Sequence, residues 1–93
     1  MLTVVSQKVT IINKSGVHAR PAGILASTAT KCNSDIVIKL GEKSINPKSI
    51  LNLMAAGIRC GTEVEIECTG EDEEKDLKTI VDIINSGLGE EAD

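Results

Sequence analysis

His18 is the only histidine of this 93-residue chain, and an arginine and a proline, Arg20 and Pro21, follow it closely. Proline suits the first turn of a helix, where its missing N–H costs nothing, so this spacing predicts a helix that begins at or just after His18. The unpaired N–H groups at a helix start favour a bound anion, and phosphate above all. These residues therefore indicate a site that handles phosphate, with a surface histidine beside a solvated arginine as the alternative.

A second segment strengthens the phosphate interpretation. Residues 46–57 read NPKSILNLMAAG, which predicts a short helix with Ser49 as its N-cap and Gly57 at its C-terminal end. Together with GVHARPA at residues 16–22, this segment makes the chain resemble the HPr family, the histidine-containing phosphocarriers of the bacterial sugar phosphotransferase system. The resemblance runs from Lys8 to Gly89. It departs from the family pattern at Gly23, inside the first helix, and in the absence of aromatic residues.

The resemblance implies a role for each residue of the first motif. His18 would take a phosphoryl group on Nδ1 from a phosphohistidine of enzyme I and pass it to a sugar-specific enzyme IIA. Arg20 would stabilise the phosphate oxygens. Such chemistry requires a neutral imidazole with a free lone pair. The implied protein is a phosphoryl carrier with a transient phosphohistidine and not a free-standing enzyme, and it requires neither cofactor nor metal.

The second motif implies regulation and docking. Serine is among the best N-caps, which is a sufficient structural explanation of Ser49. In HPr proteins of Gram-positive type, however, HPr kinase phosphorylates the serine at this place. We expect Ile50, Leu51 and Met54, with Ile24 of the first helix, to form an exposed apolar docking patch; the alternative is that some of them fill the core. Charge at Ser49 would then weaken docking of enzyme I and favour a catabolite-control transcription regulator.

Composition limits the remaining functions. The chain contains no Phe, Tyr or Trp and has a formal net charge of −4, so it lacks the stacking platforms and the basic stripe of a nucleic-acid binder. Its N-terminal segment does not read as a signal peptide and no stretch has transmembrane length, which predicts a cytoplasmic protein without a membrane partner. The three cysteines form no C-x-x-C pair, so neither a disulfide framework nor a zinc site is indicated. No self-pairing stripe is apparent, and we expect a monomer.

A length of 93 residues predicts one small domain over residues 1–93, with no room for a second. The strands have one polar face each, so helices are expected to cover only one side of the sheet. The predicted fold is α+β, an open-faced β-sandwich in which three helices cover one face of a four-stranded antiparallel sheet in the order βαββαβα. The pattern leaves the strand order open. The expected strands span residues 8–12, 35–40, 43–45 and 62–68, and the expected helices span residues 21–33, 50–57 and 71–88.

Three rival functions remain on sequence grounds. An HPr-like paralogue of a nitrogen-type regulatory phosphorelay would keep His18 and change its partners, although the Ser49 segment favours the sugar system. A ferredoxin-like regulatory or RNA-binding module shares a similar layout, but the acidic pI of about 4.9 and the missing aromatics count against it. A small acyl-transfer enzyme is the most remote, since no nucleophile-elbow pattern is present.

Overall fold

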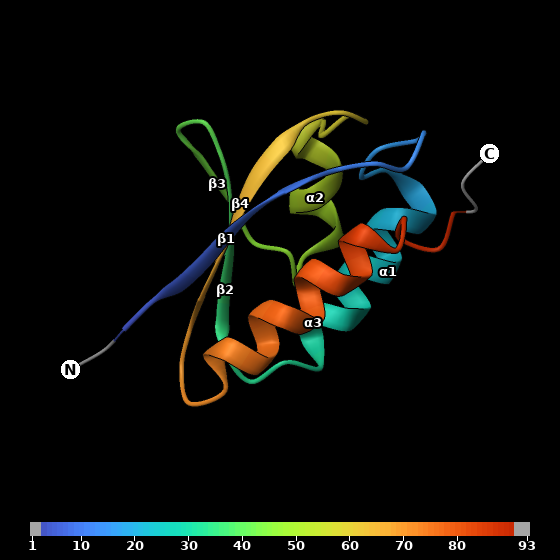
Figure 1. The fold of residues 1–93 in the computed structure, drawn as a ribbon. Helices are drawn as coiled ribbons and strands as arrows, with labels where there is room; N and C mark the ends of the chain where they lie inside the picture. The colour runs from blue at the N-terminus through green and yellow to red at the C-terminus, as the bar shows by residue number, and fades with distance from the viewer. Residues whose placement is uncertain (1–2, 91–93) are drawn as a thin grey trace.

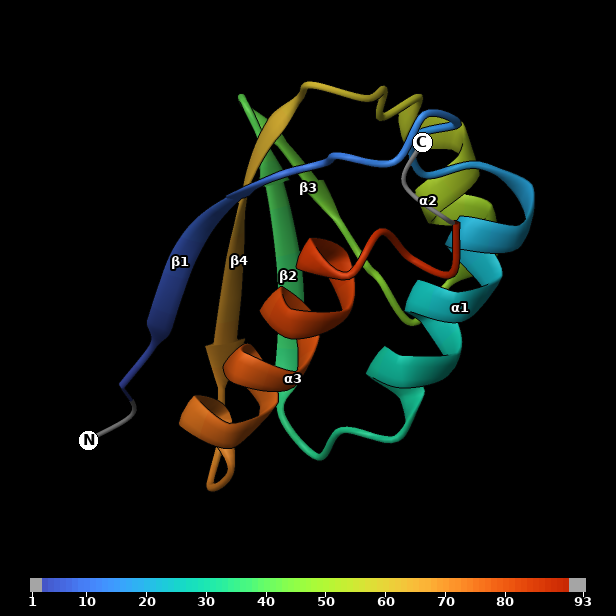
Figure 2. The same cartoon turned by 45° about the vertical axis from the view of Figure 1, so that its right-hand side comes forward.

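The computed structural model describes residues 3–90 and contains, over that range, the four strands and three helices of the predicted order. Both views in Figures 1 and 2 place α1, α2 and α3 on one side of the sheet. The fold is therefore the open-faced sandwich that the pattern predicts. The elements are β1 (Val5–Thr10), α1 (Ala19–Thr30), β2 (Asp35–Leu40), β3 (Lys43–Ile45), α2 (Ile50–Ala56), β4 (Glu63–Thr69) and α3 (Glu73–Asn85).

The sheet order is β1-β4-β2-β3, and every neighbouring pair is antiparallel. Ile66 of the central strand β4 lies opposite Gln7 on one side and Ile38 on the other. This order depends on pairings between residues far apart in the chain, which a local pattern does not encode. The last strand along the chain thus becomes the second in space, with β1 and β3 at the two edges.

The two faces of the sheet differ as the alternation of β4 predicts. Val64, Ile66 and Cys68 are buried beneath the helices, whereas the intervening glutamates face away from them. On that outer face Glu65 lies opposite Lys8 and Lys39 of the flanking strands. Cross-strand neighbours of opposite charge suit a face exposed to water. The outer face is accordingly left uncovered by helices (Figure 2).

The core is aliphatic and forms one continuous cluster between the sheet and the helices. The predicted apolar positions of α1 are all buried, as are Leu53 of α2 and Ile80 and Ile84 of α3. Each helix therefore contributes a single apolar face, as amphipathic helices do when they pack on a sheet. The buried positions of α1 are Pro21, Ala22, Leu25, Ala26 and Ala29.

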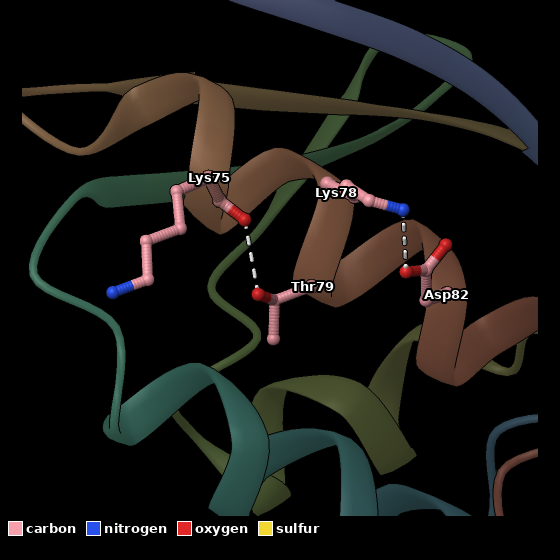
Figure 3. A network of polar contacts seen from close by, with 4 residues as sticks. All are labelled: Lys75, Lys78, Thr79 and Asp82. Carbon is pink, nitrogen blue, oxygen red and sulfur yellow. Dashed lines mark hydrogen bonds and ion pairs between the residues drawn. The ribbon is translucent and has the colours of Figure 1, made fainter.

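The exposed side of α3 is polar. Lys78 forms an ion pair of 3.2 Å with Asp82, one turn further on, and both side chains are exposed. Thr79 donates a hydrogen bond of 2.9 Å to the carbonyl of Lys75, whose ammonium group points away from the other contacts (Figure 3). A solvent-exposed ion pair at this spacing contributes only about 0.3–0.5 kcal/mol to the free energy of unfolding. The stability of α3 therefore depends on its buried face.

Several predicted boundaries were wrong by two or three residues, α1 (Ala19–Thr30, predicted 21–33) among them. The first strand begins at Val5 and ends at Thr10, because Val5 pairs with Cys68 and the polar residues after it hide the alternation. The last helix ends at Asn85, so Leu88 lies beyond it. Leu88 is nevertheless fully buried and has a φ of +52°, since the chain turns back onto the core after the helix.

A buried carboxylate connects the start of α3 to the segment that enters β2. Asp76 Oδ2 accepts hydrogen bonds from Ser34 Oγ at 2.6 Å, from Ser34 N at 2.9 Å and from Asn33 N at 3.1 Å. Burial raises the pKa of Asp76, but the hydrogen bonds from Ser34 and Asn33 outweigh it and hold the pKa below its ordinary value. Asp76 is therefore charged at neutral pH and acts as a structural acceptor.

Replacing this carboxylate should give a pH-dependent loss of stability. We expect Asp76→Asn to lower the free energy of unfolding by about 1–3 kcal/mol at neutral pH, because the amide is a weaker acceptor for the buried N–H groups. The folded pKa lies below that of the unfolded chain, so the carboxylate stabilises the fold above about pH 4 and this contribution is lost as pH falls through the folded pKa. Urea unfolding across this range measures it, with Asp82→Asn on the exposed side of α3 as the matched control. A loss that stays constant down to the acid end would contradict the assignment.

Candidate functional site

His18 lies at the N-cap of α1, as its spacing from Pro21 predicts. Its backbone is extended, with φ −140° and ψ 153°, and its carbonyl accepts the first helical hydrogen bond, from Ala22 N at 3.5 Å. The imidazole makes no capping hydrogen bond, and the residue is exposed. Its ring nitrogens are thus open to a reagent from solvent.

The start of α1 supplies a positive electrostatic environment. The first N–H groups of a helix have no partner within it, and here they belong to Ala19 and Arg20, because Pro21 has none. The first turn contains no acidic residue that would offset the helix dipole. The Arg20 side chain, also exposed, adds a guanidinium that can pair with two phosphate oxygens. The arrangement suits a dianion bound close to the imidazole.

The backbone between these two residues is strained. Ala19 has a φ of +44°, a left-handed conformation that costs an L-residue with a Cβ roughly 1–2 kcal/mol. Nothing in the sequence indicates this conformation, because a glycine would be the expected residue there. Such strain is concentrated at functional sites, where the surrounding structure holds it in place.

The loop before His18 is held against a neighbouring loop. Val17 is buried, and its N–H donates to the carbonyl of Ile58 at 2.9 Å. Gly16 has a φ of +66°, and a Cβ at this position would lie 2.4 Å from that carbonyl oxygen. Glycine is therefore required here for two reasons, the left-handed turn of the loop and the close approach of the two backbones.

An acidic residue that the sequence analysis did not identify completes the site. Glu90 lines the same surface depression as His18 and Arg20, together with Lys14 and Ser15. Hydrogen bonds from Asn13 and then Ser15 hold the pKa of Glu90 below its ordinary value, so it is a carboxylate at neutral pH. The sequence gives little indication of this contact, apart from the glycines that precede Glu90.

Ser49 occupies the predicted N-cap of α2. Its Oγ accepts hydrogen bonds from the backbone N and the side-chain Nδ2 of Asn52, both at 3.2 Å. Gly57 ends the helix with a φ of +65°, as the glycine at this end predicts. The side chain of Ser49 is partly exposed, and α2 packs against α1, so the two helices that follow His18 and Ser49 are neighbours.

Three of the four predicted patch residues share an exposed surface. Ile50, Leu51 and Met54 are 47%, 79% and 37% exposed, whereas Leu53 of the same short helix is fully buried. The expected exposure of Ile50, Leu51 and Met54 is confirmed. Ile24 of α1 is only partly exposed. We refer to Ile50, Leu51, Met54 and Ile24 as the apolar patch.

The three cysteines are unbonded; Cys32 and Cys68 are buried, and Cys60 is exposed. Burial is the main cause that raises the pKa of Cys68 to about 11, so this thiol is unreactive at neutral pH. Over residues 3–90, no group of three or more His, Cys, Asp or Glu side chains has a geometry that could hold a metal ion. Within the same range, no helix combines the length and apolar character needed to cross a bilayer.

The structure is an open-faced sandwich that presents an exposed imidazole at an uncapped helix start, a combination that suits a small phosphoryl-carrier domain. A sequence model described as "PTS HPr component phosphorylation site" matches residues 5–86. The phosphocarrier protein HPr of Mycoplasma capricolum is 46% identical over 70 residues, which cover 75% of this chain and 79% of the relative. The chain belongs to the HPr family, and it is a phosphocarrier of the phosphotransferase system rather than a catalyst.

Solved structures agree with this membership. HPr-C-His from Thermoanaerobacter tengcongensis superposes with a TM-score of 0.89 at 40% identity, over 95% of this chain and 99% of that chain. A second structure from that organism, described as an HPr dimer, has a TM-score of 0.73 at 41% identity, over 88% of this chain and 94% of that chain. The likeness thus extends over nearly the whole fold.

Proposed function

We propose that His18 is the residue that carries the phosphoryl group, accepting it from enzyme I and passing it to a sugar-specific enzyme IIA. The observation that carries this proposal is the exposed imidazole of the chain's single histidine, which makes no capping hydrogen bond at the start of α1. A neutral ring nitrogen with a free lone pair is the nucleophile that phosphoryl transfer requires. Arg20 and the first N–H groups of α1 then hold the phosphate oxygens.

The open form of the site suits a carrier. A phosphoryl group that must move on is best bound in a place where a second protein can reach it and where solvent screens the attraction. His18, Ala19 and Arg20 are all exposed. The site therefore stabilises the phosphoryl group without enclosing it, and both partners approach the same imidazole.

We propose that the apolar patch is the docking surface for enzyme I and enzyme IIA. Leu51 is the most exposed of its residues, so its replacement should weaken docking and leave the fold intact. We expect Leu51→Ser to raise the protein concentration that gives half-maximal transfer from enzyme I by about tenfold, a typical cost for a central apolar contact, with the unfolding midpoint unchanged. Val4→Ser, which changes an exposed residue just before β1, is the matched control. Unchanged transfer kinetics in the Leu51 variant would exclude it from the interface.

Ser49 is proposed as the target of HPr kinase. Its hydroxyl is partly exposed, and it is next to Ile50 of the apolar patch, so a phosphate there would add about −2 charges at the edge of the docking surface. Docking of an acidic enzyme I would be weakened. A partner with a basic surface would be favoured, and we propose the catabolite-control transcription regulator for that role.

A reconstituted relay tests these roles together. Enzyme I, labelled phosphoenolpyruvate, this chain and an enzyme IIA domain are combined, with and without prior treatment by HPr kinase and ATP. We expect label on enzyme IIA only when this chain is present, and a slower relay after kinase treatment. Ser49→Ala should relay normally and lose the effect of the kinase. A chain that enzyme I labels but that no enzyme IIA discharges would point to a paralogous regulatory relay.

We further propose that residues 1–93 act as one domain and as a cytoplasmic monomer. A single continuous core supports the one-domain assignment. The dimer described for the Thermoanaerobacter tengcongensis protein makes the oligomeric state worth measuring directly. Sedimentation at the concentrations used for the relay should give one species of about 10 kDa, from the chain mass of 9.8 kDa. A species of twice that mass would overturn the monomer.

A further inference from the structure

The segment that follows α3 is firmly attached to the molecule. Over residues 87–90, which we call the strap, Leu88 is fully buried and donates its N–H to Ile83 O at 3.2 Å. A Cβ on Gly89 would lie only 2.3 Å from Cδ1 of Ile24, so the strap runs directly over α1. In Figures 1 and 2 the strap extends from the end of α3 to the start of α1. The strap thereby places Glu90 at the candidate phosphate site.

The loop before α1 donates three hydrogen bonds to the carboxylate of Glu90. Asn13 Nδ2 donates to Oε1 at 2.8 Å, Ser15 N donates to Oε1 at 3.1 Å, and Ser15 Oγ donates to Oε2 at 2.8 Å. Asn13 Nδ2 also donates to Gly16 O at 2.7 Å, so this buried amide faces acceptors on that side. The loop thus binds an anion, and this anion is the protein's own Glu90 carboxylate.

This internal anion lies in the depression that His18 and Arg20 also line. A phosphoryl group on His18 would bring about −1.5 to −2 charges into the same depression. Like charges that share a site repel, and the repulsion raises the free energy of the form that contains both. The Glu90 carboxylate therefore opposes the attraction that Arg20 and the helix start exert on the phosphate.

Because of the chemistry of the transfer, this repulsion can decide which protein holds the phosphoryl group at equilibrium. As the His18 nitrogen forms its N–P bond, the N–P bond of the donor phosphohistidine breaks and the donor nitrogen keeps the electron pair. A phosphoimidazole is consumed and a phosphoimidazole is formed, so the intrinsic bond energies nearly cancel. The position of equilibrium then reflects the charges around each ring. A single fixed carboxylate beside one ring can shift it several-fold.

We propose that Glu90 is a tuning residue of the phosphocarrier, an internal anion that weakens the hold of the site on the phosphoryl group and so raises its transfer potential. This inference rests on the proposed role of His18. It assigns to the strap a function beyond packing. Its action on the phosphoryl group is exerted through its charge.

An exchange equilibrium tests the charge of Glu90 directly. Phosphorylated, isotope-labelled wild type and unphosphorylated Glu90→Gln are mixed with catalytic enzyme I, and intact mass gives the phosphorylated fraction of each protein. We expect the phosphoryl group to favour Glu90→Gln by about three- to ten-fold, and the preference to shrink as added salt screens the charge. A ratio of one would overturn the proposal.

Two further variants distinguish an effect of the Glu90 charge from an effect of its hydrogen bonds to the loop. Ser15→Ala removes one donor to the carboxylate, Ser15 Oγ, and keeps the carboxylate's charge, so its ratio should stay near one. A ratio equal to that of Glu90→Gln would show that only the hydrogen bonds to Glu90 matter. Glu42→Gln, in the exposed turn between β2 and β3, is the control for an acid-to-amide change elsewhere and should also give a ratio of one.

A small N-phosphoryl donor removes the dependence on enzyme I. Phosphoramidate is an anion that can phosphorylate imidazole, with ammonia as the leaving group. We expect it to label His18 of Glu90→Gln about three- to ten-fold faster than wild type, because the approaching anion meets less repulsion. Faster labelling without transfer from enzyme I would support Glu90 and reject the proposed relay, whereas equal rates would reject the tuning role.

Discussion

The His18→Ala variant is expected to take no phosphoryl label from enzyme I, while it folds as the wild type does. The chain contains no second histidine to replace the lost nucleophile. The imidazole makes no capping hydrogen bond and is exposed, so its removal should change the free energy of unfolding by less than about 0.5 kcal/mol. Labelling with phosphoenolpyruvate and a urea titration of the same sample measure the two quantities.

The Arg20→Ala variant provides the comparison for the loss of labelling in His18→Ala. Arg20→Ala retains the nucleophile and removes only the side chain expected to hold the phosphate, so it should slow transfer rather than abolish it. A variant without His18 that still accumulated acid-labile label would place the phosphoryl group on another residue. An unfolded His18→Ala variant would instead show that the imidazole has a structural contact absent from this structure.

The second large effect is expected at Gly16. A Cβ there would lie 2.4 Å from Ile58 O and 2.9 Å from Arg59 Cα, both backbone atoms that cannot move aside cheaply, and the φ of +66° adds strain. We expect Gly16→Ala to lower the free energy of unfolding by about 2–5 kcal/mol, the sum of the left-handed backbone and the overpacking terms. The displaced loop would also carry His18 away from the start of α1 and slow phosphoryl transfer.

Gly23→Ala is the matched control, because it makes the same chemical change in the same half of the molecule. A Cβ at Gly23 meets nothing within 4 Å, and the residue lies inside α1. Alanine should therefore raise the free energy of unfolding by about 0.5–1 kcal/mol. Both variants are compared by urea unfolding and by their rate of labelling. A loss below about 1 kcal/mol at Gly16 would mean that the two loops separate easily, contrary to the close approach described above.

Much of the fold follows from local patterns in the sequence. The alternation of β4 predicts its buried face, and Pro21, Ser49 and Gly57 predict helix ends that the structure confirms. The strand order does not follow, because it depends on pairings such as that of Val5 with Cys68, far apart in the chain. Local propensity is silent on such contacts.

The residues of the site likewise divide into those that the sequence predicts and those that it does not. His18 and Arg20 are evident from residue type and spacing, since a helix start and its flanking residues are adjacent in sequence. Glu90 is not evident, because Ser15 and Glu90 are separated by 75 positions and meet only when the strap packs over α1. The left-handed backbone of Ala19 is equally hidden, since an alanine carries no signal for it. Both features arise from tertiary packing.

The most direct test of the central claim identifies the bond that carries the phosphate. Wild-type protein is charged with enzyme I and phosphoenolpyruvate, and the phosphorylated form is examined by phosphorus NMR and by acid treatment. The account predicts one phosphoimidazole signal, bonded to Nδ1 of His18 and lost in acid. An acid-stable phosphate, or one bonded to an oxygen of a serine such as Ser49, would contradict His18 as the carrier of the phosphoryl group.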